Sequence, residues 1–343
     1  MNNRSPLACI CLPTYNAEST IAETLQSLIV QTYTNILIKV VDNASTDNTL
    51  SVVGIFTDPR ISIYRGVSNI GGEGNFNRCI DLATGEYTAI FHADDIYEPT
   101  MIARQVAEFE ARPEVGAVFA EATLIDESGK PIGAVARPRE LRGESHVYNF
   151  QEIFKATLRH SNFLMCPSAM LRTRIYRDEI KRFRAELFGS SADLDVWLRV
   201  LEGHLISILP DRLLQYRITV TQGSHALGRR RTTRSDFFRV IDYYLEKQNV
   251  RSVLSDGDLR NKECLERTDR IVCASNIFLQ DRSGEVLALC EGAFSRSALL
   301  AAFRNRRGLQ TLVLAAYLKF VIFLSLVSPG KALLSWIKHF SRR

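Results

Sequence analysis

The 343-residue chain contains no Cys-x-x-Cys pair, although it has seven cysteines. The cysteines are scattered, and Cys9 and Cys11 alternate within an apolar run that is typical of a strand. An odd, dispersed set without metal-ligand spacing argues against a zinc cluster. It favours reduced thiols in a protein core.

A secretory signal is also missing from the N-terminal sequence MNNRSPLA, where no basic segment precedes a long apolar run. Internal repeats and low-complexity segments are absent from the sequence as well. With 46% hydrophobic and 24% charged residues, the composition is that of a globular protein. We therefore expect a large domain with an appended module, located in the cytoplasm.

The sequence has little excess charge, with a formal net charge of +5 that comes mostly from the late part of the chain. Nucleic-acid binding would require a stronger basic bias with interleaved aromatic residues. We therefore expect no nucleic-acid partner.

What the first hundred residues do contain is an alternation of strand and helix patterns. Short apolar runs bounded by turn residues predict strands at 7–12, 36–41, 61–64 and 87–91, with helical spacing between them. This alternation predicts an α/β fold with a mixed, mostly parallel sheet and flanking helices.

The sequence pattern of the rest of the chain changes near residue 225. A strand pattern at 115–125 runs into a hairpin-like turn, 166–171 has the pattern of a short strand, and 193–201 has helical spacing. Beyond 225 the sequence has only long, Arg-rich helical patterns. We predict a domain over 1–225, with halves at about 1–98 and 99–225, and a C-terminal helical extension over 226–343.

Polar segments follow three of the predicted strands: Thr14-Tyr15-Asn16, Asp42-Asn43 and His92-Ala93-Asp94-Asp95. Ligands bind beyond the carboxyl ends of the strands in sheets of this kind. The convergence of three polar loops at one edge therefore predicts a binding site.

Asp94 and Asp95 are adjacent carboxylates at a strand end, which is costly unless a cation or hydrogen-bond donors compensate them. Carboxylate oxygens suit Mg²⁺ or Mn²⁺, which bridge to phosphate oxygens. A solvated turn whose Asp caps the next helix is the alternative. The three converging loops favour the metal site.

Asp42 either accepts hydrogen bonds from a base or ribose or caps the following helix, and its spacing leaves both open. The Gly71-Gly72-x-Gly74 loop places backbone N–H groups where a diphosphate could bind. The G-x-G-x-x-G fingerprint of dinucleotide-binding folds does not follow the first strand.

Taken together, these motifs resemble the family 2 glycosyltransferases, which have the Rossmann-like GT-A fold. The resemblance covers about residues 7–225 and rests on Leu12-Pro13-Thr14-Tyr15-Asn16, Ser27-Leu28-x-x-Gln31, Val41-Asp42-Asn43-x-Ser45-x-Asp47, Asn69-x-Gly71 through Asn75, Gly85-Glu86-Tyr87 and Ala93-Asp94-Asp95. It implies an inverting transfer of a sugar from a nucleoside-diphosphate sugar to an acceptor hydroxyl. The expected acceptor is a glycan or a lipid-linked glycan in surface polysaccharide assembly.

The resemblance also implies which residues hold the donor. Asp94 and Asp95 match the family's D-x-D region, which binds ribose and a Mg²⁺ or Mn²⁺ ion. His92 stands where the first Asp of that motif often occurs, so its imidazole touches the metal, touches the ribose or packs in the core. The residues implied to bind the nucleotide sugar are Pro13, Tyr15, Asn16, Asp42, Asn69, Arg78 and Asp94.

The segment Ser191–Arg199 resembles the family's E-D-x-D-x-W-x-R motif, which carries the base that activates the acceptor. By that match Asp193 is the base, with a helix cap as the alternative. Asp195 is expected to pair with Arg199, its i+4 neighbour. Trp197 is either a core residue, which we favour, or a platform beneath the acceptor sugar.

Arg217 and His225 fall where the family often places a loop over the donor phosphates. The histidine that usually follows Tyr-Arg-x in the family is Thr219 in this chain.

Residues 308–327 form an apolar stretch with one charge, Lys319, and are long enough to cross a bilayer. A central Lys costs roughly 2.5–3.5 kcal/mol on insertion scales, so spanning is marginal. Basic residues on both sides favour a helix lying on the cytoplasmic face of a membrane. A helix buried against the main domain or in a homo-oligomer interface is the alternative.

Two rival functions stay open on the sequence alone. A metal-dependent nucleotidyl or phosphoryl transferase would need more phosphate-binding Lys or Arg residues beside the N-terminal loops. Lys39 is a poor candidate for this role because it lies on a predicted strand. A non-catalytic, membrane-bound sugar-nucleotide binder is suggested by His92 and Ala192, which replace usual acidic residues.

Overall fold

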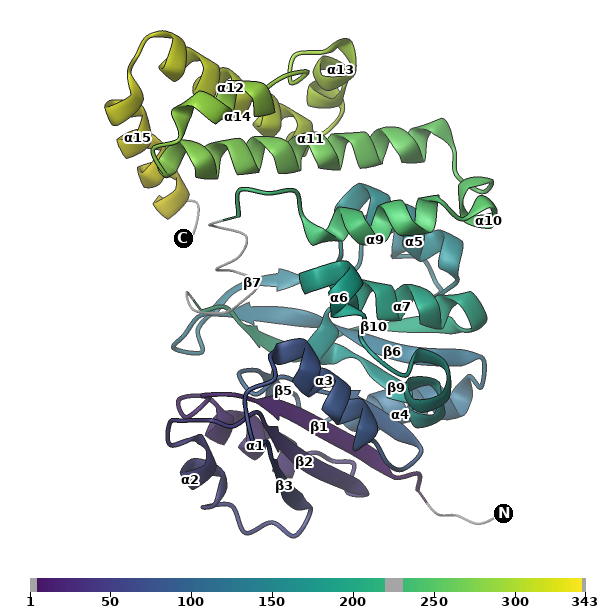
Figure 1. The fold of residues 1–343 in the computed structure, drawn as a ribbon. Coiled ribbons are helices and arrows are strands. Elements are labelled where there is room, and N and C mark those ends of the chain that lie inside the picture. The colour runs from purple at the N-terminus through teal and green to yellow at the C-terminus, as the bar shows by residue number, and fades with distance from the viewer. Residues whose placement is uncertain (1–4, 220–230, 341–343) are drawn as a thin grey trace. The chain divides into compact units, whose positions relative to one another are not determined.

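The computed structural model describes residues 5–219 and 231–340 of the chain, which divides into two units (Figure 1). The first unit comprises Met1–Ala156 and Asn162–Thr219, and the second comprises Thr157–Ser161 and Val220–Arg343. The predicted domain boundary at residue 225 lies outside the described residues.

The first unit alternates strands and helices over its N-terminal half, as the apolar periodicity predicts. Its strands are β1 Ala8–Thr14, β2 Ile36–Asp42, β3 Ile61–Arg65, β4 Tyr87–Ile90, β5 Ile96–Tyr97, β6 Val115–Ile125, β7 Pro131–Val135, β8 Val147–Tyr148, β9 Met170–Arg172 and β10 Leu205–Arg217. Its helices are α1 Ile21–Ile29, α2 Thr49–Val53, α3 Gly72–Asp81, α4 Met101–Ala111, α6 Ala185–Phe188 and α7 Ala192–Gly203, and α5 Phe150–His160 extends into the second unit.

All these strands belong to one mixed sheet with the order β3-β2-β1-β4-β9-β6-β10-β5, to which β7 and β8 are added by pairing with β6 and β10 (Figure 1). The strands β3, β2, β1 and β4 are parallel to one another. Thr14 is in register with Asp42, and Asp42 with Arg65. The carboxyl ends of β1, β2 and β3 therefore lie side by side, and the predicted α/β fold with a mixed sheet is confirmed.

The long strand β10 runs parallel to β6 and was not predicted from the sequence. Its segment contains Pro210 and Asp211, which are signals for a turn. The pairing with β6 shifts register on either side of Arg212, so the strand accommodates the proline at a bulge.

The strand predicted at 166–171 is displaced by the structure toward the C-terminus. Cys166–Ser168 form a 3₁₀ turn, which Pro167 favours at its start, and the strand proper is Met170–Arg172. That strand pairs antiparallel with both β4 and β6 and so joins the two halves of the sheet.

The core of the first unit lies between the sheet and its helices. The inner face of α1 buries Ile21, Leu25 and Leu28, which recur at helical spacing. The rings of Phe91 and Tyr97 stack with centroids 4.1 Å apart just after β4. This packing fixes the turn that carries Asp94 and Asp95.

The second unit is helical in its described part. Its helices are α9 Asp236–Leu245, α10 Gln248–Arg251, α11 Asp256–Leu279, α12 Ser283–Leu289, α13 Arg296–Arg304, α14 Arg306–Phe323 and α15 Val327–Phe340. The α14 helix packs closely on its neighbours, since a Cβ at Gly308 would lie 2.5 Å from the Ala301 backbone and one at Gly330 would lie 2.3 Å from Val321.

The apolar stretch 308–327 is not one helix, because α14 ends at Phe323 and Ser325 adopts a positive φ of 55°. Among the described residues, none of the helices combines the length and apolar character needed to traverse a bilayer.

Candidate functional site

Three loops at the carboxyl edge of the sheet are tied to one another by side-chain hydrogen bonds. After β1, the Asn16 N–H donates to the Ser45 hydroxyl (3.0 Å), and the Asn16 Oδ1 accepts from the Thr46 N–H (2.8 Å). After β2, the Asn43 Nδ2 donates to Asn69 Oδ1 at 2.9 Å. Asn16 and Asn69, which are predicted to bind the nucleotide sugar, thus belong to loops that are connected along one edge of the sheet.

Asp42 is buried at the end of β2, where its two carboxylate oxygens accept from the Ser45 N–H at 3.2 and 3.3 Å. Asp42 does not cap the following helix, because the N-cap residue of α2 is Asn48. The Asp42 carboxylate instead holds the Ser45 loop that follows β2. Arg78 donates from α3 to the Asp42 carbonyl at 3.0 Å and to the Tyr64 and Arg65 carbonyls. Arg78 therefore holds the ends of β2 and β3 together.

Pro13 and Tyr15 lie at the end of β1 and directly after it. Pro13 is half-buried, whereas the Tyr15 ring is exposed beside the Asn16 loop. An exposed aromatic ring at this edge offers a surface on which a base can stack.

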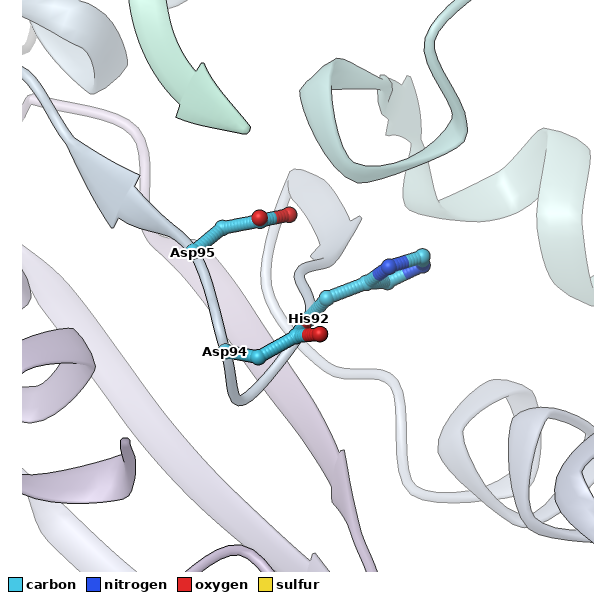
Figure 2. A group of neighbouring side chains, drawn as sticks. All are labelled: His92, Asp94 and Asp95. Carbon is cyan, nitrogen blue, oxygen red and sulfur yellow. The ribbon is translucent and has the colours of Figure 1, made fainter. Parts of the chain in front are cut away.

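The turn after β4 presents three candidate metal ligands. Figure 2 shows the side chains of His92, Asp94 and Asp95 extending from this turn toward the same side. Their ligand atoms all lie within 4.8 Å of one another. Two carboxylates and an imidazole in such proximity form a donor set for a divalent cation.

Two atoms of this cluster have no hydrogen-bond partner among the described residues. His92 Nε2 and Asp95 Oδ2 are both buried and unpaired. An unpaired buried polar atom costs free energy that an ordinary turn would avoid. These two atoms remain available to bind a group from outside the protein.

Burial disfavours the charged forms of both His92 and Asp95. Burial lowers the pKa of His92, with the Asp94 carboxylate acting in the opposite direction, so the neutral imidazole is favoured. Burial and the neighbouring Asp94 charge raise the pKa of Asp95 well above its ordinary value. A cation between these groups would offset the free-energy cost of ionising the buried Asp95 carboxylate.

The structure corrects the prediction that Arg217 lies in a loop over the donor phosphates. Arg217 ends β10 and is only 3% exposed. Its backbone N–H donates to Asp95 Oδ1 at 2.8 Å and its Nε donates to the Asp94 carbonyl at 2.9 Å. The guanidinium also contacts the Asp126 and Glu127 carbonyls and pairs with Glu23.

Arg217 therefore positions the acidic turn, because its donors are occupied by protein groups. Helix α1 and its N-cap residue Thr20 hold the same turn. The Thr20 hydroxyl donates to the Ala93 carbonyl at 2.9 Å, and the Thr24 hydroxyl donates to the Asp95 carbonyl at 2.8 Å. These threonines were missed in the sequence, where only their i, i+4 spacing on a helix could have marked them.

Asp193 lies in the first turn of α7 and accepts a hydrogen bond from Asn162 Nδ2 at 3.1 Å. Burial raises the pKa of Asp193 from 3.8 to about 6, with the Asn162 hydrogen bond among the weaker effects that lower it. Asp193 does not cap α7, since the N-cap residue is Ser191. A carboxylate with such a pKa is suited to accept a proton near neutral pH.

Cys166 lies close enough to both Asp193 and Asp95 for their charges to act on its thiol. Burial, then Asp193 and then Asp95, raise the pKa of Cys166 well above its ordinary value. The sequence predicts a reduced core thiol at this position. Asp95 and Asp193 therefore both lie within electrostatic range of the Cys166 thiol.

The other two predicted residues of α7 are structural. Asp195 is fully buried and pairs with Arg199 at 3.0 Å, as predicted, and also with Arg184. Trp197 is 0% exposed and packs edge-to-face against Phe119, with ring centroids 5.0 Å apart. A platform role for Trp197 beneath an acceptor sugar is therefore wrong, because no face of the ring is accessible.

His225, predicted near the donor phosphates, lies outside the described residues.

The sheet order, the acidic turn after β4 and the separate carboxylate at the start of α7 are the arrangement expected of the GT-A fold class. Residues 9–179 match the family model of Glycosyl transferase family 2. The chain belongs to this family.

Relatives of the chain include several glycosyltransferases. It is 28% identical over 218 residues to an uncharacterised glycosyltransferase of Methanocaldococcus jannaschii, covering 62% of this chain and 71% of the relative. It is 28% identical to one of Haemophilus influenzae, covering 71% and 76%. Over 101 residues it is 35% identical to the Escherichia coli UDP-Glc:alpha-D-GlcNAc-diphosphoundecaprenol beta-1,3-glucosyltransferase WfgD, covering 29% and 40%.

Solved structures share the fold at low sequence identity. Staphylococcus aureus TarS 1-349 in complex with UDP-GlcNAc is 17% identical with a TM-score of 0.59, covering 93% of this chain and 92% of that one. The chain spans 55% of the longer TarS structure. The mannosyltransferase PcManGT from Pyrobaculum calidifontis, in complex with GDP-Man and Mn²⁺, is 19% identical with a TM-score of 0.54, covering 96% and 87%.

Proposed function

We propose that this chain is a metal-dependent, inverting glycosyltransferase that moves a sugar from a nucleoside-diphosphate sugar to an acceptor hydroxyl. The observation that carries the proposal is the pair of unpaired buried atoms, His92 Nε2 and Asp95 Oδ2, in a cluster of candidate metal ligands. Asp95 of this cluster and Asp193 both act electrostatically on the Cys166 thiol. One group of residues would hold the donor phosphates, and the other would take the proton of the acceptor.

The donor nucleoside is proposed to bind along the connected edge formed by the loops after β1, β2 and β3. The exposed Tyr15 ring offers a stacking surface, and Asp42 lies at the end of the neighbouring strand. In sheets of this type, ligands bind outside the carboxyl ends of the strands. The hydrogen bonds of Asn16 and Asn69 keep these loops in place before the donor arrives.

The cluster of His92, Asp94 and Asp95 fits a divalent cation. The two carboxylates suit both Mg²⁺ and Mn²⁺, whereas the imidazole is a ligand that Mg²⁺ rarely accepts. Mn²⁺ is therefore the better match for this donor set. When bound, the cation would supply positive charge beside the donor diphosphate.

Asp193 is proposed as the base. The acceptor oxygen forms a bond to the anomeric carbon while the bond from that carbon to the diphosphate oxygen breaks, and the acceptor proton passes to the Asp193 carboxylate. A single displacement of this kind inverts the anomeric configuration. Asn162 holds one carboxylate oxygen, which leaves the other free of that hydrogen bond.

The acceptor is proposed to be a lipid-linked or polysaccharide glycan at the cytoplasmic face of a membrane. The WfgD relative supports this choice, since its name specifies a diphosphoundecaprenol-linked acceptor. The basic and apolar C-terminal helices would bring the chain to the surface where such acceptors occur.

Nucleoside-diphosphate sugars are expected to raise the melting temperature of the protein when Mn²⁺ is present. A ligand at 100 times its Kd adds about 2.7 kcal/mol to the stability of the folded state, which corresponds to a rise on the order of several °C. A thermal-shift screen of UDP-, GDP- and dTDP-sugars with Mn²⁺, Mg²⁺ or chelator tests this. Stabilisation by nucleoside triphosphates, with no preference for diphosphate sugars, would support a nucleotidyl transferase instead.

The transfer rate is expected to fall as the pH drops through about 6, the pKa of Asp193. Burial raises this pKa, so protonation removes the base at a higher pH than for an exposed Asp. The pH profile of kcat/KM measures the midpoint. In Asn162→Ala, the loss of the hydrogen bond that lowers this pKa should move the midpoint to higher pH. A midpoint near 4 in the unaltered protein would contradict the assignment.

A further inference from the structure

The helix α14 is apolar on two faces, and only one of them packs against the rest of its unit. Thr311, Ala315 and Leu318 face inward, the last two within the hydrophobic core of the second unit. Another set, Leu309, Val313, Ala316, Phe320 and Phe323, recurs with 4-3-4-3 spacing and is exposed. This spacing places the exposed residues on a single stripe of the helix.

The neighbouring helices add exposed apolar side chains of large size. Phe303 on α13 is 89% exposed, Phe323 on α14 is 85% exposed, and Trp336 on α15 is 57% exposed. Isolated exposed apolar residues are ordinary, but a contiguous apolar stripe such as that of α14 marks an interaction surface. We call the exposed α14 residues Leu309, Val313, Phe320 and Phe323 the apolar C-terminal surface.

The sequence after Glu291 carries charge of one sign. No Asp or Glu occurs after Glu291, whereas nine Arg and Lys residues do. Among them Arg296 and Arg306 are exposed, and Lys319 lies on α14 beside Phe320. A second copy of the chain docked on this surface would bring like charges together, which opposes self-association.

A hollow of about 500 Å³ opens on the same surface, lined by Leu287, Lys319, Phe320, Ile322 and Phe323. Four of these five side chains are apolar, and the remaining one, Lys319, lies 5.1 Å from the centroid of the Phe294 ring. An acyl chain fits the apolar lining, and an anionic head group fits the ammonium.

We propose that the apolar C-terminal surface docks onto an anionic lipid bilayer, with its aromatic side chains in the interface and the basic residues at the lipid phosphates. Aromatic and aliphatic residues on one face with basic flanks are the features of helices that lie on membranes. This inference specifies the lipid-facing surface within the proposed function, on which it rests for its biological purpose.

Vesicle flotation of the full chain tests the proposal. The protein should float with vesicles of equal parts phosphatidylglycerol and phosphatidylcholine, and less with phosphatidylcholine alone. Phe320→Ser/Phe323→Ser should lower the partition coefficient about tenfold or more, because two aromatic rings leave the interface. Arg296→Gln/Arg306→Gln should remove much of the preference for anionic vesicles, as should high salt.

A matched control is Ile55→Ser/Leu187→Ser, which removes two exposed apolar side chains from the first unit. This control should float like the unaltered protein. Equal flotation of the Phe320→Ser/Phe323→Ser variant, or no flotation of any form, overturns the proposal. Light scattering without lipid tests for a dimer. A concentration-dependent dimer of the unaltered protein that is lost in the Phe320→Ser/Phe323→Ser variant would mean that a second copy covers the surface, and it would also overturn the proposal.

Flotation requires neither donor nor turnover, so its result is separate from the fate of the proposed function. A chain that floats but transfers no sugar would refute the function and keep the surface. A chain that glycosylates a soluble acceptor without floating would support the proposed function and refute the membrane-docking surface.

Discussion

Asp193→Asn is expected to reduce the rate of sugar transfer by about 10²–10⁴-fold, the range that a positioned general base contributes. The amide has nearly the same shape as the carboxylate, but it cannot take the acceptor proton. Donor affinity should stay within a few-fold of the original value, because Asp193 lies on α7 and not among the loops after β1, β2 and β3. Transfer rates and calorimetric donor titration measure the two quantities.

Asp211→Asn is a matched control, since Asp211 is an exposed carboxylate that pairs with Arg104. It should transfer sugar at the original rate. Two outcomes would contradict the role of Asp193. An unchanged rate would mean that another group is the base, and equal losses of donor binding and rate in a correctly folded variant would mean that Asp193 holds the donor. A non-catalytic binder would show no transfer in any of the three proteins.

Much of the fold follows from the sequence, because the apolar runs of β1, β2, β3 and β4 match the period of buried parallel strands and are separated by helical spacing. The edge that carries Asn16, Asp42 and Asp94 follows from the same pattern, since parallel strands end at a common edge. The i+4 pair of Asp195 and Arg199 follows from helix geometry alone.

The interior supports of the site do not follow from local patterns. Arg217 contacts the acidic turn although more than 120 residues separate them in the sequence. It lies on β10, whose sequence predicts a turn because it contains Pro210. Whether Trp197 is covered depends on Phe119, which belongs to a different strand. The electrostatic effect of Asp95 and Asp193 on Cys166 depends likewise on how β9 joins the two halves of the sheet.

Asp95→Asn is expected to weaken Mn²⁺ binding at least tenfold and to lower the transfer rate on the order of 100-fold, as a carboxylate ligand becomes an amide. The turn itself should persist, because the amide oxygen of Asn can still accept the Arg217 N–H. Electron paramagnetic resonance of free Mn²⁺ during titration measures binding without requiring activity. Asp211→Asn again provides the surface control.

The stability of Asp95→Asn separates a metal site from a purely structural turn. Burial and Asp94 raise the pKa of Asp95, so its ionised form is disfavoured in the folded protein at neutral pH. Removing this charge should therefore leave the metal-free melting temperature unchanged or raise it, while the stabilisation by added Mn²⁺ disappears. A lower metal-free melting temperature with intact Mn²⁺ binding would mean that Asp95 serves only the Arg217 contact. A residue that serves function at a cost to stability should give an unchanged or higher metal-free melting temperature when it is replaced. Asp95 has the properties of such a residue, because it is buried next to Asp94 and has one unpaired oxygen.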